Sequence, residues 1–220
     1  MTGGEVQRDD QLRAYAASRR TSRGAESYAT KYDREWHKRV SSHAERRVIR
    51  RLLRRTGLRS GAVLDVPCGA GRLTPLLEPV ASQLVSADYS ASMVSVMRRV
   101  RGHAGLVSDA FHLPFSDCSF DLVFSARLSH HIADADRRAR YLGEVMRVSR
   151  SWTIATVFDS DSLKNRLREL RRRFTHKRPK HTLSREQVAA IATGAGFEIE
   201  AALPLSRLAS GHVYYLFRRI

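Results

Sequence analysis

The chain has 220 residues, of which 42% are hydrophobic and 28% charged, a balance typical of one soluble globular domain. No run approaches the roughly 20 apolar residues of a membrane-spanning helix, the N-terminus lacks a signal-peptide core, and two cysteines predict no disulfide framework or metal site. A cytoplasmic protein is expected, and its net charge of +17 predicts attraction to phosphate, anionic lipid or acidic substrates.

The N-terminal region is predicted to form an arm followed by a helical cap. Residues 1–25 are polar and arginine-rich, which is typical of a flexible basic arm. Over 26–57, apolar and aromatic residues recur every three or four positions and predict two successive helices. Tyr28 and Tyr32 lie on this apolar stripe, so they are candidate substrate contacts, although packing in the core would explain them equally well.

From residue 58 onward the chain alternates between predicted strands and helices. Apolar runs predict strands over 62–66, 83–88, 104–108, 120–125 and 152–158, with helices over 73–79, 91–100 and 133–148. Ser90 and Ser184 are expected helix N-caps, and two further strands over 197–203 and 212–218 predict an antiparallel hairpin at the sheet edge. Residues 26–220 therefore predict one α/β domain with a doubly wound, mostly parallel seven-stranded sheet.

A basic helical insertion over 160–182 separates the fifth strand from the last helix. Between Asp161 and Arg185 ten Lys or Arg residues accompany two acids, and apolar residues recur at helical spacing. The segment 161–185 fits a lid helix packed on the domain, a helix lying on an anionic membrane surface, or an RNA-binding segment. Few aromatic residues interleave the basic ones, which disfavours base stacking.

The segment VLDVPCGAGR, residues 63–72, is the most informative stretch of the chain. A buried strand ending near Asp65 leads into a loop with Gly69 and Gly71, and a helix-like segment follows. Such a strand, glycine loop and helix allow a nucleotide-like ligand to approach the backbone closely. Pro67 would remove one backbone donor from this loop.

The loop resembles the D-x-G-x-G-x-G motif of class I S-adenosylmethionine (SAM)-dependent methyltransferases, with Pro67 in place of the first glycine. Further matches follow in order over roughly residues 28–218: Asp88, Asp109-Ala110, an L-P-F-x-x-x-S-F-D run over 113–121, His130-His131, and A-G-F over 195–197. The third and fourth of these resemble the ubiquinone/menaquinone-biosynthesis branch. The resemblance implies SAM as cofactor and S-adenosylhomocysteine (SAH) as product.

The resemblance also implies roles for individual residues. The expected cofactor-binding residues are Asp65, Gly69, Ala70, Gly71, Asp88, Tyr89, Asp109 and Ala110. Asp65 would orient the loop or meet the methionine ammonium, Asp88 the ribose hydroxyls, and Asp109 the adenine amine. His130 and His131 are candidate general bases, and Arg127 is a candidate contact to an anionic acceptor. Each carboxylate could instead be a cap or turn residue.

The sequence thus predicts a SAM-dependent methyltransferase, EC 2.1.1.-, acting on a small-molecule or lipid-linked, anionic acceptor, peripheral to a membrane in the lipid case. The alternative is a basic RNA-modifying or nucleic-acid-binding protein on a methyltransferase-like fold. Binding of SAM separates an enzyme from a binding module that lacks turnover.

Overall fold

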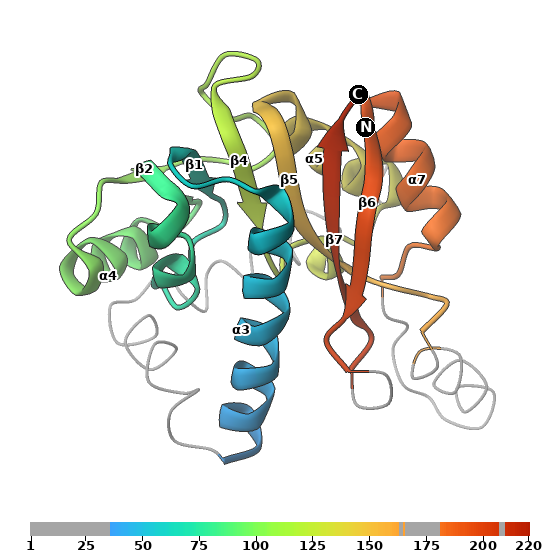
Figure 1. The fold of residues 1–220 in the computed structure, drawn as a ribbon, viewed down its shortest axis with the longest axis horizontal. Coiled ribbons are helices and arrows are strands. Elements are labelled where there is room, and N and C mark those ends of the chain that lie inside the picture. The colour runs from blue at the N-terminus through green and yellow to red at the C-terminus, as the bar shows by residue number, and fades with distance from the viewer. Residues whose placement is uncertain (1–35, 163–164, 166–180, 207–209) are drawn as a thin grey trace, which may run out of the picture.

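A seven-stranded sheet forms the centre of the computed structural model, which describes residues 36–162, 165, 181–206 and 210–220 (Figure 1). Its strand order is β3-β2-β1-β4-β5-β7-β6. The strands are β1 (Gly61–Asp65), β2 (Ala81–Asp88), β3 (Gly105–Val107), β4 (Phe120–Ser125), β5 (Ser149–Phe158), β6 (Phe197–Pro204) and β7 (His212–Arg219). The predicted Rossmann-like α/β fold is confirmed.

The sheet is parallel from β3 to β5 and antiparallel beyond. β1 pairs in parallel with β2 and β4, β2 with β3, and β4 with β5, whereas β7 runs antiparallel to both β5 and β6. The predicted hairpin therefore places β7 inside the sheet and β6 at its edge. As a consequence, the carboxyl ends of β1 to β5 share one edge of the sheet with the amino end of β7.

Helices cover both faces of the sheet (Figure 1). α3 (Trp36–Thr56) lies on one face, whereas α5 (Ala135–Arg147) and α7 (Arg185–Gly194) pack on the other, and α4 (Ala91–Arg101) packs against β2 and β3. Neighbouring strand residues such as Val63 and Leu64 belong to different core clusters, one shared with α3 and one with α5. This division follows from the alternation of side chains along a strand.

Two of the predicted helices differ from the structure. α3 continues through residues 44–47, where two helices were expected, because no glycine or proline interrupts that stretch. The expected helix over 73–79 is instead two 3₁₀ turns, η1 (Thr74–Leu76) and η2 (Glu78–Val80), each beginning with a proline near its first position. Pro79 has no N–H and cannot extend the first turn into an α-helix.

Both predicted helix caps are confirmed. The Ser90 hydroxyl accepts the Met93 N–H at the start of α4, and Ser184 forms a capping box with Gln187 at the start of α7. The arm over 1–25, Tyr28, Tyr32 and nearly all of the basic insertion lie outside the described residues. Within the described part of the chain, no helix is long and apolar enough to cross a membrane.

Candidate active site

The glycine loop after β1 is folded across the carboxyl end of the sheet. The Val66 N–H donates to Phe124 O at 2.9 Å, and the Cys68 N–H donates to Ala87 O at 2.8 Å. Pro67 lies between these two donors, so the loop forms without an N–H at position 67. Gly69 and Gly71 have φ values of 55° and 76°, the left-handed region that glycine adopts without strain.

Asp88 at the end of β2 holds this loop in place. Its Oδ2 accepts the Gly69 N–H at 2.8 Å, and its Oδ1 accepts the Ser90 N–H at 2.9 Å. The side chain is half-buried, and the following Tyr89 is 54% exposed. Since a carboxylate has about four acceptor positions, Asp88 can bind this loop and still accept bonds from ligand hydroxyls.

Asp109 lies beside Asp88 at the same sheet edge. The Ser108 N–H donates to Asp88 O at 3.0 Å, so the two chain segments are adjacent. Asp109 Oδ1 accepts the Phe111 N–H at 2.9 Å in a local turn, its side chain is half-buried, and Ala110 beyond it is buried. The structure thus brings the predicted ribose and adenine carboxylates together with the glycine loop.

Asp65 is directed into the protein. It is 2% exposed, and the Thr74 hydroxyl donates to its Oδ2 at 2.6 Å. Burial, helped by the charge of Asp88 and opposed by the Thr74 hydrogen bond and the charge of Arg72, raises the pKa of Asp65 to about 7. The hydrogen bond from Thr74 fits the predicted role of Asp65 in orienting the loop, and a contact of Asp65 with a methionine ammonium stays a prediction.

Glu45 connects α3 to the site, and sequence reasoning missed it. This fully buried carboxylate accepts Arg127 Nε at 2.7 Å and the Tyr214 hydroxyl, and its Oε2 lies 2.7 Å from an Arg72 nitrogen. Burial alone would raise the pKa of Glu45, but the two guanidinium groups lower it below its usual value. Glu45 is the lone acid in the basic helix α3, which is the sequence signal that could have identified it.

Arg127 follows β4 in a left-handed conformation with φ 65°. Its N–H donates to the Thr156 hydroxyl at 2.5 Å, and its guanidinium is paired with Glu45. The side chain is 23% exposed. Arg127 therefore shares the single charge of Glu45 with Arg72, and its contact with an anionic acceptor stays a prediction.

Three histidines gather where β4, β5 and β7 meet. The rings of His130 and His131, in η3 (Ser129–His131), lie 4.1 Å apart, and the His212 ring lies 4.8 Å from that of His130. Phe158 packs against both His130 and His212. Sequence reasoning missed His212, because only the antiparallel pairing of Phe158 with His212 brings β7 to this position.

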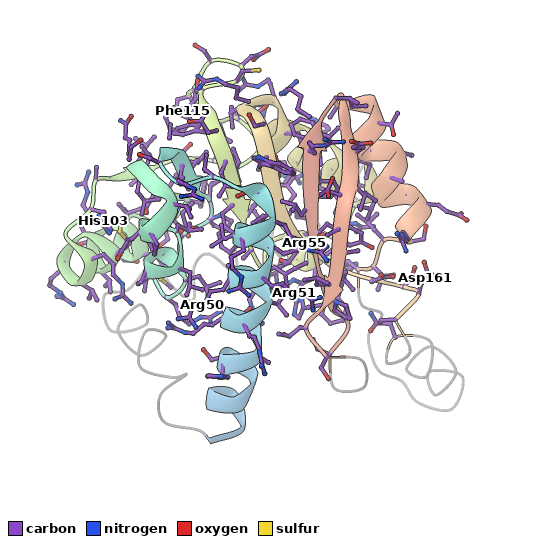
Figure 2. The ribbon with its side chains drawn as sticks, in the orientation of Figure 1. Arg50, Arg51, Arg55, His103, Phe115 and Asp161 are labelled. Carbon is purple, nitrogen blue, oxygen red and sulfur yellow. The ribbon has the colours of Figure 1, made fainter. Side chains whose placement is uncertain are left out.

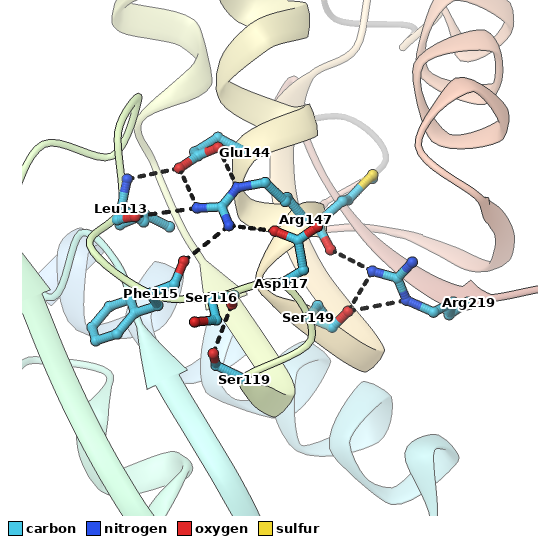
Figure 3. Close-up of polar contacts among 10 residues, drawn as sticks. Leu113, Phe115, Ser116, Asp117, Ser119, Glu144, Arg147, Ser149 and Arg219 are labelled. Atoms are coloured by element: carbon cyan, nitrogen blue, oxygen red, sulfur yellow. Dashed lines mark hydrogen bonds and ion pairs between the residues drawn. The ribbon is translucent and has the colours of Figure 1, made fainter.

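The L-P-F segment is anchored to α5 by Arg147 (Figure 3). This guanidinium donates to Phe115 O at 2.9 Å and Leu113 O at 3.1 Å, and it pairs with Asp117 and Glu144. Glu144 in turn accepts the Leu113 N–H at 2.7 Å, and the hydrogen bond from Arg147 holds the pKa of Glu144 below its usual value. The segment after Asp109 is thereby fixed to the helix layer.

Comparison with known proteins supports the similarity to methyltransferases that the sequence indicates. Residues 64–154 match the family model described as methyltransferase domain. A methyltransferase of Encephalitozoon cuniculi is 38% identical over 101 residues, 46% of each chain, and human probable tRNA methyltransferase 9B is 34% identical over 86 residues, 39% of this chain and 18% of its own. The chain thus spans less than half the length of these relatives.

Solved structures share the fold. Magnesium protoporphyrin IX methyltransferase of Synechocystis with bound SAH superposes with a TM-score of 0.69 at 14% identity, over 84% of this chain and 88% of that one. The superposition supports the sheet architecture, and the sequence match covers the glycine loop, Asp88 and Asp109. The stretch over residues 64–154 is thus similar to a methyltransferase domain, and the sheet around it has the fold of a solved methyltransferase.

Proposed function

We propose that this protein transfers the methyl group of SAM to an acceptor held at the carboxyl ends of β4 and β5. The observation that carries this proposal is the connection from Asp88 to the Gly69 N–H at 2.8 Å, because it joins the ribose-binding candidate to the glycine loop. Asp109 lies one strand further along the same edge.

The residues at this edge fit the parts of SAM. Asp88 has acceptor capacity for the ribose hydroxyls, and Asp109, which uses one oxygen for the Phe111 N–H, is the acceptor we propose for the adenine amine. The exposed ring of Tyr89 provides a flat apolar surface beside Asp88 on which an adenine can stack. Ala70 and Ala110 are small and buried, so neither position adds a large side chain at this edge of the sheet.

When bound, SAM supplies an electrophilic methyl group on a sulfonium. The protein's own contribution is to hold the acceptor in line with that methyl group, which can supply several kcal/mol of the acceleration. An acceptor oxygen or nitrogen that carries a proton must lose it, and an imidazole nitrogen of His130 or His131 is the base we propose. His212 and Phe158 pack around His130 and position its ring.

Calorimetry with SAH tests the cofactor site. Asp88→Ala should weaken SAH binding by about 1.5–3 kcal/mol, because a charged acceptor is lost. Asp88→Asn keeps one acceptor oxygen and should lose less. Asp136→Asn, which changes an exposed residue in the first turn of α5, is the matched control and should bind like the native protein. Unchanged affinity in Asp88→Ala, or no SAH binding by the native protein, would contradict the assignment.

The acceptor class is a separate part of the proposal. The sequence favours a small-molecule or lipid-linked anionic acceptor, with the protein in the cytoplasm and at a membrane surface in the lipid case. RNA is the second candidate, because a relative that shares the cofactor-binding half is named as a tRNA methyltransferase and the net charge is +17. Methylation assays with SAM carrying a labelled methyl group distinguish the two candidates, since label would be recovered in RNA or in a small-molecule or lipid fraction.

A further inference from the structure

The outer face of α3 is an arginine surface. Its members are Arg47, Arg50, Arg51, Arg54 and Arg55, which are all exposed. Figure 2 labels three of them, Arg50, Arg51 and Arg55, along the helix. Among the residues that the structure describes, none of the five has an ion pair or a side-chain hydrogen bond, since the one acid of α3, Glu45, is buried against Arg72 and Arg127.

This arrangement destabilises the isolated helix. Arg47 and Arg51, Arg50 and Arg54, and Arg51 and Arg55 each stand four residues apart, so their like charges are neighbours on the helix surface. Each such pair costs about 0.2–0.5 kcal/mol. A bound polyanion would remove this repulsion, whereas no described carboxylate does so.

Between residues 42 and 56, the apolar side of α3 is not available for insertion into a membrane. Ile49, Leu52 and Leu53 are buried in the core cluster that α3 shares with the sheet. Within residues 42–56, whose side chains the structure describes, α3 has no exposed large hydrophobic side chain. A helix that lies in a membrane interface buries its apolar face in lipid, so this surface lacks the contact that a membrane requires.

The spacing of the arginines suits a phosphate backbone. Arg47 and Arg55 are separated by about 12 Å along the helix axis, at about 1.5 Å per residue. Along a DNA double helix each strand carries one phosphate per about 3.4 Å of axis, so this distance spans several phosphates of a nucleic-acid backbone. Arginine also presents a planar fork of donors that matches phosphate oxygens in two-point contacts.

The surface begins next to the candidate active site. Glu45, two residues before Arg47, bonds to Arg127 beyond β4 and to Arg72 after the glycine loop. We propose that the outer face of α3 binds the phosphate backbone of RNA and guides it toward the acceptor position. This inference rests on the proposed methyltransferase function and selects RNA as the acceptor class.

Binding of a fluorescently labelled single-stranded RNA, measured by anisotropy from 50 to 300 mM salt, tests the proposal. The double variant Arg51→Gln/Arg55→Gln should bind roughly tenfold more weakly at low salt. The slope of log affinity against log salt should become shallower by about 1.4, at 0.7 per lost contact to a single strand. Arg51→Lys/Arg55→Lys should keep most of the slope, because both positive charges remain.

A matched control removes the same charge from positions outside α3 and outside the basic segment 161–185. Arg140 on α5 and Arg218 on β7 are exposed, so Arg140→Gln/Arg218→Gln should retain the native salt slope. Equal losses in both double variants would mean that overall charge, not α3, binds RNA, and would overturn the proposal. It would also fail if the native protein bound no RNA, bound DNA of the same base sequence more tightly, or bound anionic vesicles through the same two arginines.

SAH binding provides the independent measurement. Both double variants should bind SAH like the native protein, since neither pair contacts the glycine loop, Asp88 or Asp109. Absence of SAH binding in the native protein would contradict the proposed function, and RNA binding that depends on α3 would still establish the surface. Normal SAH binding without RNA binding would overturn only the α3 proposal.

Discussion

The buried carboxyl of Asp65 makes a quantitative prediction about stability and pH. The pKa of Asp65 in the folded chain is about 7, against 3.8 for an ordinary aspartate, so the folded protein retains a proton that the unfolded chain has released between these values. The free energy of unfolding therefore falls as the pH rises from 3.8 to about 7. Above this range Asp65 is ionised in both states and adds no further pH dependence. One pKa unit corresponds to about 1.4 kcal/mol, so the full effect is about 4 kcal/mol.

Asp65→Asn removes the titration and keeps an acceptor for the Thr74 hydroxyl. Urea unfolding from pH 5 to 8 should show the free energy of unfolding of this variant rising by about 2–3 kcal/mol relative to that of the native protein, because only the native protein loses stability as Asp65 ionises. Thr74→Val removes a bond that lowers the pKa of Asp65, so its stability should continue to fall at higher pH. A pH-independent difference between Asp65→Asn and the native protein would refute the reasoning.

Three other substitutions test the contacts that support the site. Glu45→Ala should cost about 2–4 kcal/mol in urea unfolding, because it leaves two guanidinium groups without their buried partner, and Glu45→Gln should cost less; equal costs would show that the charge is unimportant. Arg147→Ala should lower stability by about 1–2 kcal/mol, and faster hydrogen exchange at the Leu113 amide should accompany it, since Arg147 also orients Glu144. Ser184→Ala should lower stability by about 1 kcal/mol through loss of the α7 cap, and an unchanged melting temperature would contradict the capping assignment.

Local sequence patterns predicted most of the elements well. β4 was predicted at its observed bounds, 120–125, and the caps at Ser90 and Ser184 were correct, because alternating burial and capping depend on residues a few positions apart. The short segment after the glycine loop was predicted less well. Its two prolines divide it into 3₁₀ turns, which hydrophobic spacing alone does not reveal.

The sequence by itself determined the α/β class, the glycine loop and the carboxylates at or just beyond the carboxyl ends of β1, β2 and β3, because these features lie within short, continuous segments. Only the tertiary structure placed β7 between β5 and β6 and thereby brought His212 to His130. It also showed that Glu45 pairs with both Arg72 and Arg127, while the outer arginines of α3 have no ion pair with a described carboxylate. Ion pairs and side-chain hydrogen bonds depend on distances in space between residues up to 169 positions apart in the chain, as for the hydrogen bond from Tyr214 to Glu45, and no local pattern contains that information.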